Sequence, residues 1–255
     1  MIRSRKGGWI IGRGVYYGRY SLLDDLVGRV SYFQTLLLAV LDELPERRIA
    51  DWAEALYQCM SYPDPRIWCN HIGSLSGEVR SSSVAGISAG ILASDSHMYG
   101  PGVVMEEVYD LYHHGLVKQE NKELLPQILR DCARWRGRRF IVSGFGRPIA
   151  TGDERIATME RVSKELGLEA GPYLTFAYDV ERYLLEAQGE SLNLTGYAVA
   201  VMMDFGWTLL EIQRTCSIIV TSGVAACYSE AYDNPPESFL PLRCEDIEYR
   251  GHAPR

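Results

Sequence analysis

The stretch that decides the fold lies at residues 144–155 and reads GFGRPIATGDER. Its first half is a loop in which two glycines flank Phe145 and Arg147 follows directly. Its second half begins helical periodicity at Asp153, and this periodicity continues to Leu166. The stretch therefore predicts a loop that presents Arg147 and leads into a helix.

Helical periodicity also covers most of the chain on both sides of this stretch. An apolar stripe over residues 21–41 predicts one helix, and Pro45 begins a second, which ends at Tyr62-Pro63-Asp64-Pro65. Residues 71–93 are rich in Ser, Gly and Ala, which suits a central helix packed closely against its neighbours. Further helical windows span residues 104–114, 123–135, 173–188, 195–204 and 208–228. Strand signals are few beyond a short extended lead-in at residues 9–20, so the pattern predicts an all-α fold.

The composition fits one globular domain. The 255 residues are 47% hydrophobic and 23% charged, which suits one well-buried core with room for a small second lobe. A formal charge of −7 and a pI of about 5.3 argue against a nucleic-acid partner, because such a protein needs a basic face. Residues 134–139, RWRGRR, form the densest basic patch, with two interpretations: a site for a phosphate or nucleotide tail, or a solvated helix end.

The six cysteines are scattered, without the paired or His-rich spacing that binds metals. We interpret them as small core residues of a protein in a reducing compartment, and we expect no metal site. The basic residues 1–6 are followed by glycine and arginine before a signal-type apolar core can form. No window has the apolar length of a membrane span. We therefore expect a cytoplasmic protein without a membrane partner.

Five segments follow one another in a fixed order along the chain. They are Arg13-Gly14 with YSLLDDLVGR at residues 20–29 and ELP at 43–45; NHIGSLSG at 70–77; GFGRPI at 144–149 with DER at 153–155; LNLTG at 192–196; and PLRCEDIEY at 241–249. In this order they resemble the citrate synthase superfamily, particularly its short citryl-CoA lyase branch and the C-terminal portion of ATP-citrate lyase. The corresponding family patterns are "RGY…LEDLIG…GELP", "DHG…SG", "GFGHPL…GDPR", "LNVDG" and the C-terminal tail. The resemblance covers nearly the whole chain.

The resemblance implies a helical homodimer with one citrate synthase-like domain over residues 1–255 and a small lobe at about residues 116–195. In this family the active site lies between the large and the small lobe, and the chemistry makes or breaks a carbon–carbon bond next to a thioester carbonyl. Coenzyme A is implied as a cosubstrate, with no tightly bound cofactor. Gly144, Phe145 and Gly146 correspond to the part of the motif that is implied to contact coenzyme A.

Two catalytic positions of the family hold other residues here. Citrate synthases enolise the thioester with an aspartate, and that position is Thr195, whose hydroxyl cannot act as a general base near neutral pH. The histidine after GFG is replaced by Arg147, which stays protonated but can donate two fixed hydrogen bonds to an oxyanion or carboxylate. We expect Arg147 to stabilise charge without moving protons; the alternative is a salt bridge to a nearby acid.

Residues 94–102, SDSHMYGPG, stand where the family has its first catalytic histidine before a Gly-Gly pair. Two alignments remain open, because the glycines place Tyr99 at that position whereas the register of the following helix places His97 there. Together with Asp95, either alignment gathers titratable side chains on one short loop, as an acid–base site requires.

The resemblance also assigns the substrate-binding residues. His71 matches a histidine that binds the oxoacid, with a satisfied structural histidine as the alternative. Arg155 and Arg243 match carboxylate-binding positions, and Arg243 is implied to reach across the dimer. The remaining arginine of that clamp is Val220 here, so we expect citrate to bind poorly and a less charged substrate to fit better.

Two functions follow from these residues. The first is a lyase or transferase that cleaves or forms a carbon–carbon bond in a small carboxylic or CoA-linked substrate other than citrate. One variant of it keeps coenzyme A, and the other has lost coenzyme A and acts by retro-Claisen or hydrolytic cleavage. The second is a non-catalytic paralogue that binds a metabolite and regulates. A true citryl-CoA lyase with displaced catalytic groups is a further alternative. The polar groups kept at His71, Arg155 and Arg243 favour an enzyme.

Overall fold

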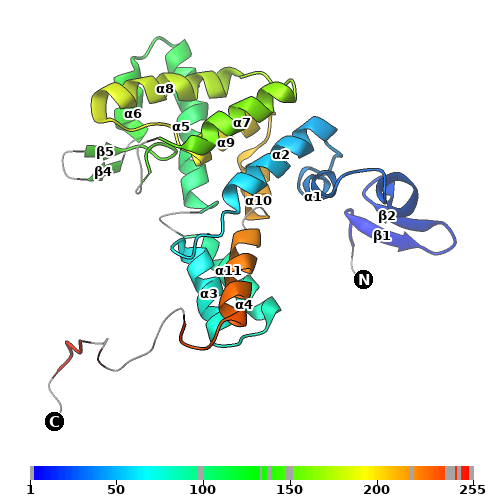
Figure 1. The fold of residues 1–255 in the computed structure, drawn as a ribbon. Coiled ribbons are helices and arrows are strands. Elements are labelled where there is room, and N and C mark those ends of the chain that lie inside the picture. The colour runs from blue at the N-terminus through cyan, green and yellow to red at the C-terminus, as the bar shows by residue number, and fades with distance from the viewer. Residues whose placement is uncertain are drawn as a thin grey trace. The chain divides into compact units, whose positions relative to one another are not determined.

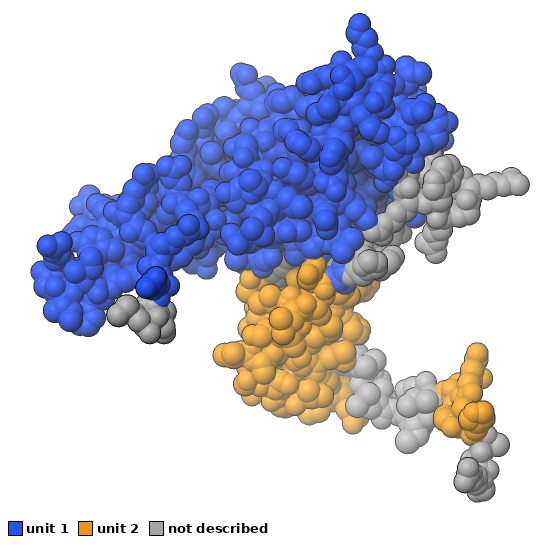
Figure 2. All heavy atoms as spheres, turned by 180° about the vertical axis from the view of Figure 1, so that it is seen from behind, with its two compact units in different colours: residues 1–60, 96–219 blue, residues 61–95, 220–255 orange. Residues whose placement is uncertain are grey.

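Helices dominate the computed structural model (Figure 1), which confirms the all-α prediction. The structure describes residues 3–96, 100–132, 134–136, 139–147, 152–218, 221–238, 245 and 248–252. These residues form two compact units, Met1–Met60 with Ser96–Ile219 (unit 1) and Ser61–Asp95 with Val220–Arg255 (unit 2), which are coloured separately in Figure 2. Residues 116–195, the expected small lobe, belong to unit 1.

Unit 1 begins with a small antiparallel sheet in place of the extended lead-in. Strands β1 (Gly7–Ile10), β2 (Gly14–Tyr17) and β3 (Tyr20–Ser21) pair in the order β1-β2-β3. The single helix predicted from residue 21 to 41 is wrong: the segment forms a π-helical turn, η1 (Leu22–Leu26), and a separate helix α1 (Tyr32–Leu41). Gly28 has a positive φ of 73°, which interrupts the helix, and Ser31 starts α1 with a capping box.

The rest of unit 1 consists of seven helices and a hairpin within the described residues. They are α2 (Arg47–Met60), α5 (Val103–Glu120), α6 (Leu125–Cys132), β4 (Arg134–Arg136), β5 (Arg139–Ile141), α7 (Glu154–Glu165), α8 (Pro172–Gln188), α9 (Leu194–Asp204) and α10 (Leu209–Ser217). The helix predicted over residues 123–135 is therefore too long. It ends at Cys132, and the arginine-rich segment pairs as the antiparallel hairpin β4–β5 rather than ending a helix.

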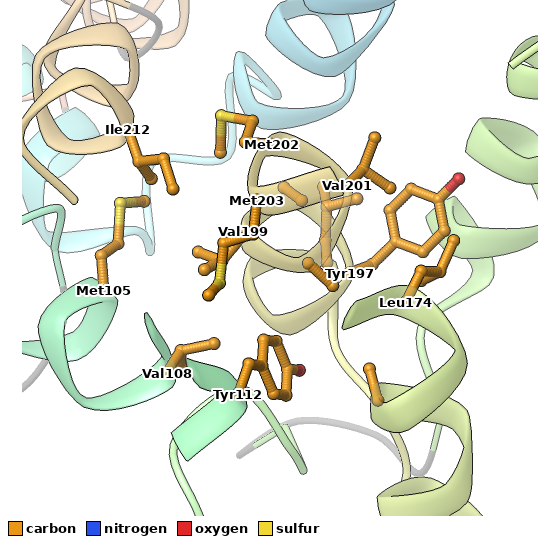
Figure 3. Close-up of a cluster of buried hydrophobic side chains, with 14 of the residues drawn as sticks. Met105, Val108, Tyr112, Leu174, Tyr197, Val199, Val201, Met202, Met203 and Ile212 are labelled. Atoms are coloured by element: carbon orange, nitrogen blue, oxygen red, sulfur yellow. The ribbon is translucent and has the colours of Figure 1, made fainter. Parts of the chain in front are cut away.

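Helix α9 is the centre of the unit 1 core. Figure 3 shows its apolar side chains, among them Val199 and Met203, facing residues of the helices around it: Met105, Val108 and Tyr112 of α5, Leu174 of α8, and Ile212 of α10. Every residue from Gly196 to Met203 is buried. Complete burial of a Val or Met side chain contributes about 1.5–3 kcal/mol, so burial stabilises α9 along its length, and its first turn lies at the candidate site.

Unit 2 is a cluster of three helices, α3 (Trp68–Glu78), α4 (Ser83–Ser94) and α11 (Thr221–Asp233). The continuous helix predicted over residues 71–93 is wrong, because Arg80 adopts a positive φ of 59° and Ser82 caps a new helix. The helix predicted over 208–228 is likewise two helices, α10 and α11, in different units. The expected close packing is confirmed: a Cβ at Gly73 would lie 2.8 Å from the carbonyl oxygen of Val224 on α11.

Candidate active site

The loop that follows β5 is pinned to the segment that precedes α9. The Gly146 N–H donates to the Ser191 carbonyl (2.7 Å), and the Asn193 N–H donates to the Gly144 carbonyl (3.0 Å). Asn193 Nδ2 also donates to the Gly146 carbonyl at 2.9 Å. These bonds join the GFG and LNLTG segments, which lie about fifty positions apart in the sequence, into one local structure.

Two glycines allow this close approach. Gly144 has a positive φ of 88°, and its Cα lies against Gly196 in the first turn of α9. A Cβ at Gly196 would overlap the carbonyl oxygen of Gly144 and lie 2.8 Å from the Leu192 side chain. The buried hydroxyl of Tyr112 donates to the Gly196 carbonyl at 3.2 Å, which ties α5 to the same turn. Only glycine fits at position 196 without moving the loop.

Gly144, Phe145 and Gly146, which are expected to contact coenzyme A, form this loop and pack against the protein interior. Gly144 and Phe145 are buried, and the Phe145 ring packs edge-on against Tyr112. The Phe145 N–H donates to the Val142 carbonyl at 3.1 Å, and the Gly146 N–H and both glycine carbonyls have the partners described above. These polar backbone atoms are therefore used within the protein.

Asp153 is the hub of the site. Its side chain has no solvent exposure, and its two oxygens accept from Nε and Nη2 of Arg155, each at 2.7 Å. The same carboxylate accepts from the Leu194 N–H at 2.9 Å and caps α7 by accepting from the Arg155 N–H at 3.3 Å. Burial acts to raise the pKa of Asp153, but the hydrogen bonds and positive charge of Arg155 outweigh it, so the pKa lies below its usual range.

Arg147 lies next to Asp153, and its side chain is 16% exposed. Its Nη1 donates to Glu154 Oε2 at 2.6 Å and lies 3.6 Å from Asp153 Oδ1. The Gly152 carbonyl is a third, longer contact at 3.4 Å. The salt bridge to a nearby acid, which the sequence left as the alternative, is therefore present in this structure, and Glu154 is the acid.

Thr195 is the second residue of α9 and is partly buried. Asn193 caps the helix by accepting from the Gly196 N–H at 3.1 Å, and Leu194 is held by Asp153. The structure thus brings Thr195, Arg147 and Arg155 to one place, through bonds to the residues on either side of Thr195. The positive ends of α7 and α9 both lie here, which favours negative charge.

His71 and Asp95 belong to unit 2. On α3, His71 Nδ1 lies 3.1 Å from the Pro65 carbonyl, and the preceding Asn70 side chain donates to the carbonyls of Tyr62 (2.9 Å) and Asp64 (3.1 Å). The contact with Pro65 ties the imidazole to the preceding loop, and the Asn70 bonds hold the start of α3 against the same loop. Asp95 is the exposed C-cap residue of α4. The predicted site residues His97, Tyr99 and Arg243, and also Val220, lie outside the described residues.

Sequence reasoning assigned no role to several residues that build the site. Asp153 stands at the start of one predicted helix and Asn193 two positions before another, and Asp or Asn at such a position is the N-cap signal that could have found them. Glu154 and Glu190 carried no such signal. The Glu190 carboxylate lies against the Cα of Gly146, where a Cβ would overlap it, and only the tertiary structure brings the two residues together.

In the described part of the chain, no group of three or more His, Cys, Asp or Glu side chains is arranged to hold a metal ion. None of the helices described combines the length and the apolar character that crossing a membrane requires.

No family model matches the sequence, and no curated protein sequence matches it. Solved structures do match. The citryl-CoA lyase from Hydrogenobacter thermophilus matches with a TM-score of 0.81 and 23% identity, over 100% of this chain and 96% of that chain. The ATP citrate lyase from Methanothrix soehngenii, in complex with citrate and coenzyme A, matches with a TM-score of 0.78 and 15% identity, over 99% of this chain and 42% of that one.

A citrate synthase from the thermophilic archaeon Thermoplasma acidophilum, solved as a ternary complex, matches less closely. Its TM-score is 0.61 at 17% identity, over 88% of this chain and 58% of that chain. The order of the GFG, LNLTG and other motif segments pointed to this group of folds. This protein has the fold of the citrate synthase superfamily.

Proposed function

We propose that the protein is a carbon–carbon lyase or acyltransferase that breaks or forms a bond next to a carbonyl in a small carboxylic or CoA-linked substrate. The observation that carries this proposal is the position of Arg147, a largely buried guanidinium on a loop fixed to the first turn of α9. Breaking such a bond leaves an electron pair on carbon, and its charge spreads to the carbonyl oxygen. A preorganised donor at that oxygen lowers the barrier.

Proton transfer needs another group, because neither Arg147 nor Thr195 can serve as a base near neutral pH. We assign it to the loop with Asp95, His97 and Tyr99, as the sequence predicts. Thr195 then contributes a hydroxyl that can orient the substrate by a hydrogen bond.

Coenzyme A is the proposed cosubstrate. The support is the fold shared with a citryl-CoA lyase and with an ATP citrate lyase solved with citrate and coenzyme A. Citrate itself is a poor candidate for the carboxylic part, because Arg155 is already paired with Asp153 and Arg147 with Glu154. A substrate with fewer carboxylates needs fewer cations.

We also propose that the protein is a homodimer and that unit 2 supplies the interface. Helix α4 carries no charged residue, and it exposes Val84 (77%) and Leu92 (79%), which stand on one helix face with Ser88 between them. An uncharged apolar face matches a second copy of itself better than a charged partner, and a two-fold axis would pair the same residues from both chains.

A cytoplasmic location is proposed on the cysteines. The five described cysteines, Cys59, Cys69, Cys132, Cys216 and Cys227, are all free thiols. Unpaired cysteines are usual in a reducing compartment.

One observation favours a second function, a non-catalytic paralogue that binds a metabolite and regulates. Both arginines of the site already have carboxylate partners within the chain, so the cluster is electrically balanced before any substrate arrives. A protein of this kind would bind small carboxylates or CoA thioesters without turning them over.

Turnover assays on the purified protein separate the two functions. Citryl-CoA, acetyl-CoA with oxaloacetate, and a panel of acyl-CoA thioesters would be incubated with the wild type, Arg147→Ala and a control, Arg161→Ala, which removes an exposed arginine of the same region. We expect the wild type to cleave a thioester other than citryl-CoA. The turnover rate is expected to fall by about 10²–10³-fold in Arg147→Ala and to stay unchanged in Arg161→Ala. Binding without turnover across the panel would support the regulatory function instead.

A further inference from the structure

We infer that Glu154 is a specificity-determining residue. Its carboxylate pairs with Arg147, and it is the only carboxylate of the described cluster that a substrate can displace. A substrate then binds Arg147 through one carboxylate in place of Glu154. This inference deepens the proposed function and rests on it for the identity of the site.

The contact between Arg147 and Glu154 has the features of an exchangeable pair. Arg147 Nη1 donates to Glu154 Oε2 at 2.6 Å, yet the Glu154 side chain is 75% exposed whereas Arg147 is only 16% exposed. Glu154 is the first residue of α7, so its side chain can rotate into water without breaking a helical hydrogen bond. The guanidinium stays in place while its anion is replaced.

Glu154 is charged when it competes with the substrate. Its own backbone N–H and the Arg147 guanidinium hold the pKa of this carboxyl below its usual range, so it is ionised at neutral pH. A substrate carboxylate must therefore displace an anion of the same chemical kind, and the geometry that suits Glu154 also suits the substrate.

The second cation of the cluster cannot exchange in the same way. Arg155 is bound at two points by Asp153, whose side chain is wholly buried and also holds the Leu194 N–H. Rotation of Asp153 away from Arg155 would leave a buried charge without a partner and release the first turn of α9. Arg155 is thus a positioning residue, although the family pattern implied a carboxylate clamp.

The charge balance then selects the substrate. The two arginines and the two carboxylates that pair with them cancel, and replacement of Glu154 by one substrate carboxylate keeps that balance. A second or third carboxylate would find no unpaired cation in the described cluster, because Asp153 already holds Arg155 at two points. The preferred substrate portion carries a single carboxylate next to its reacting carbonyl, as a 2-oxo monocarboxylate does, so that different N–H groups of Arg147 hold the carboxylate and the adjacent carbonyl oxygen.

Titration calorimetry on the full chain tests the inference with three named probes: pyruvate with one carboxylate, oxaloacetate with two and citrate with three. The variants are Glu154→Gln, which keeps the shape of the side chain without its charge, and the control Glu165→Gln. Glu165 lies on the same helix and pairs with Arg161 at 3.0 Å, in an ion pair whose side chains are 61% and 62% exposed. Circular dichroism confirms that each variant is folded.

We expect Glu154→Gln to tighten pyruvate binding by roughly three- to tenfold, because pyruvate no longer has to displace the Glu154 carboxylate from Arg147. The gain is limited because water partly screens the ion pair between Glu154 and Arg147. Glu165→Gln is expected to leave the dissociation constant unchanged, and Arg147→Ala in the Glu154→Gln background is expected to abolish the gain. In the wild type, citrate should bind no more tightly than pyruvate.

Three results would overturn the inference. The first is pyruvate binding by Glu154→Gln that is unchanged or weaker than in the wild type. The others are much tighter binding of citrate than of pyruvate by the wild type, and no binding of any probe by the wild type or by Glu154→Gln. Because binding is measured without turnover, its outcome is separate from that of the proposed function. If Glu154→Gln binds pyruvate more tightly but the protein cleaves no thioester, the lyase assignment is wrong, and the displacement of Glu154 by a substrate carboxylate is still supported.

Discussion

Asp153 and Arg155, two positions apart at the start of α7, form a two-point ion pair in which both nitrogen–oxygen distances are 2.7 Å. The carboxylate is fully buried, and the guanidinium side chain is 30% exposed. Since the same carboxylate also holds the Leu194 N–H and lies near Arg147, one acidic side chain sets the relative positions of three segments of the candidate site.

Replacement Asp153→Asn is expected to destabilise the protein by about 2–3 kcal/mol, somewhat less than for a completely dry pair because Arg155 keeps partial access to water. The amide loses the charge that pairs with Arg155. Urea unfolding followed by circular dichroism measures the change. The control Glu165→Gln removes an exposed partner of Arg161 and is expected to change the free energy of unfolding by less than about 1 kcal/mol.

The same carboxylate predicts a pH dependence. Because the pKa of Asp153 is lower in the folded chain than the unfolded value of about 3.9, its contribution to stability is present above that value. The contribution is lost as the pH falls through the folded-state pKa. We expect the difference in unfolding free energy between wild type and Asp153→Asn to shrink below about pH 4. A difference that stays constant from pH 7 to pH 2 would contradict the assigned pKa direction.

Replacement Gly196→Ala is expected to cost about 1–3 kcal/mol or more, because the new Cβ would overlap the Gly144 carbonyl, a backbone atom that cannot rotate away. Differential scanning calorimetry would show the loss as a lower Tm. The matched control is Gly8→Ala on the exposed strand β1, where a Cβ meets nothing within 4 Å. An equal Tm for the two variants would mean that the contact between GFG and α9 is looser than described.

Removal of the Asp204 carboxylate is expected to weaken α8. Its two oxygens accept from the N–H groups of Gly171 (3.0 Å), Tyr173 (2.9 Å) and Leu174 (3.1 Å), and α8 has no side-chain cap of its own. Asp204→Ala therefore should lose about 1–2 kcal/mol, as other N-cap deletions do. Asp204→Asn keeps one acceptor oxygen and is expected to recover part of that loss in the same urea titration.

The thiol of Cys216 is expected to resist alkylation in the folded protein. It lies in the unit 1 core, and burial raises its pKa to about 12, so almost none of it is thiolate at pH 8. Iodoacetamide treatment followed by peptide mass spectrometry should label the exposed Cys132 first and Cys216 only in denaturant. Native labelling of Cys216 at the rate of Cys132 would contradict the packing around α10.

The proposed dimer is tested at α4. Light scattering of the wild type is expected to give twice the chain mass of 28.7 kDa. Leu92→Glu places a charge on the apolar face of α4 and is expected to give the single-chain mass, whereas Leu210→Glu, on the exposed face of α10 in unit 1, is not. A wild type that stays a monomer at micromolar concentration would remove the support for an interface at α4.

The sequence by itself determined the fold class, because apolar periodicity acts over a few neighbouring positions. It placed α7, α8 and α9 to within two residues at each end, and the order of its motifs pointed to the citrate synthase fold. It failed where one residue interrupts a periodic pattern: Gly28 and Arg80 turn the backbone to positive φ, and the apolar pattern continues past both.

The tertiary structure alone decided which charges meet. Arg147, Asp153, Glu154 and Arg155 all stand in one quoted stretch, yet their pairing depends on side-chain burial, which spacing along the chain does not encode. Asp153 is buried against Leu194, forty-one residues away, and this burial keeps its carboxylate bound to Arg155. Glu154 is exposed, so a substrate carboxylate can displace it from Arg147. A hydrogen bond shielded from water is held firmly and one open to water is not, and only the folded chain distributes that shielding.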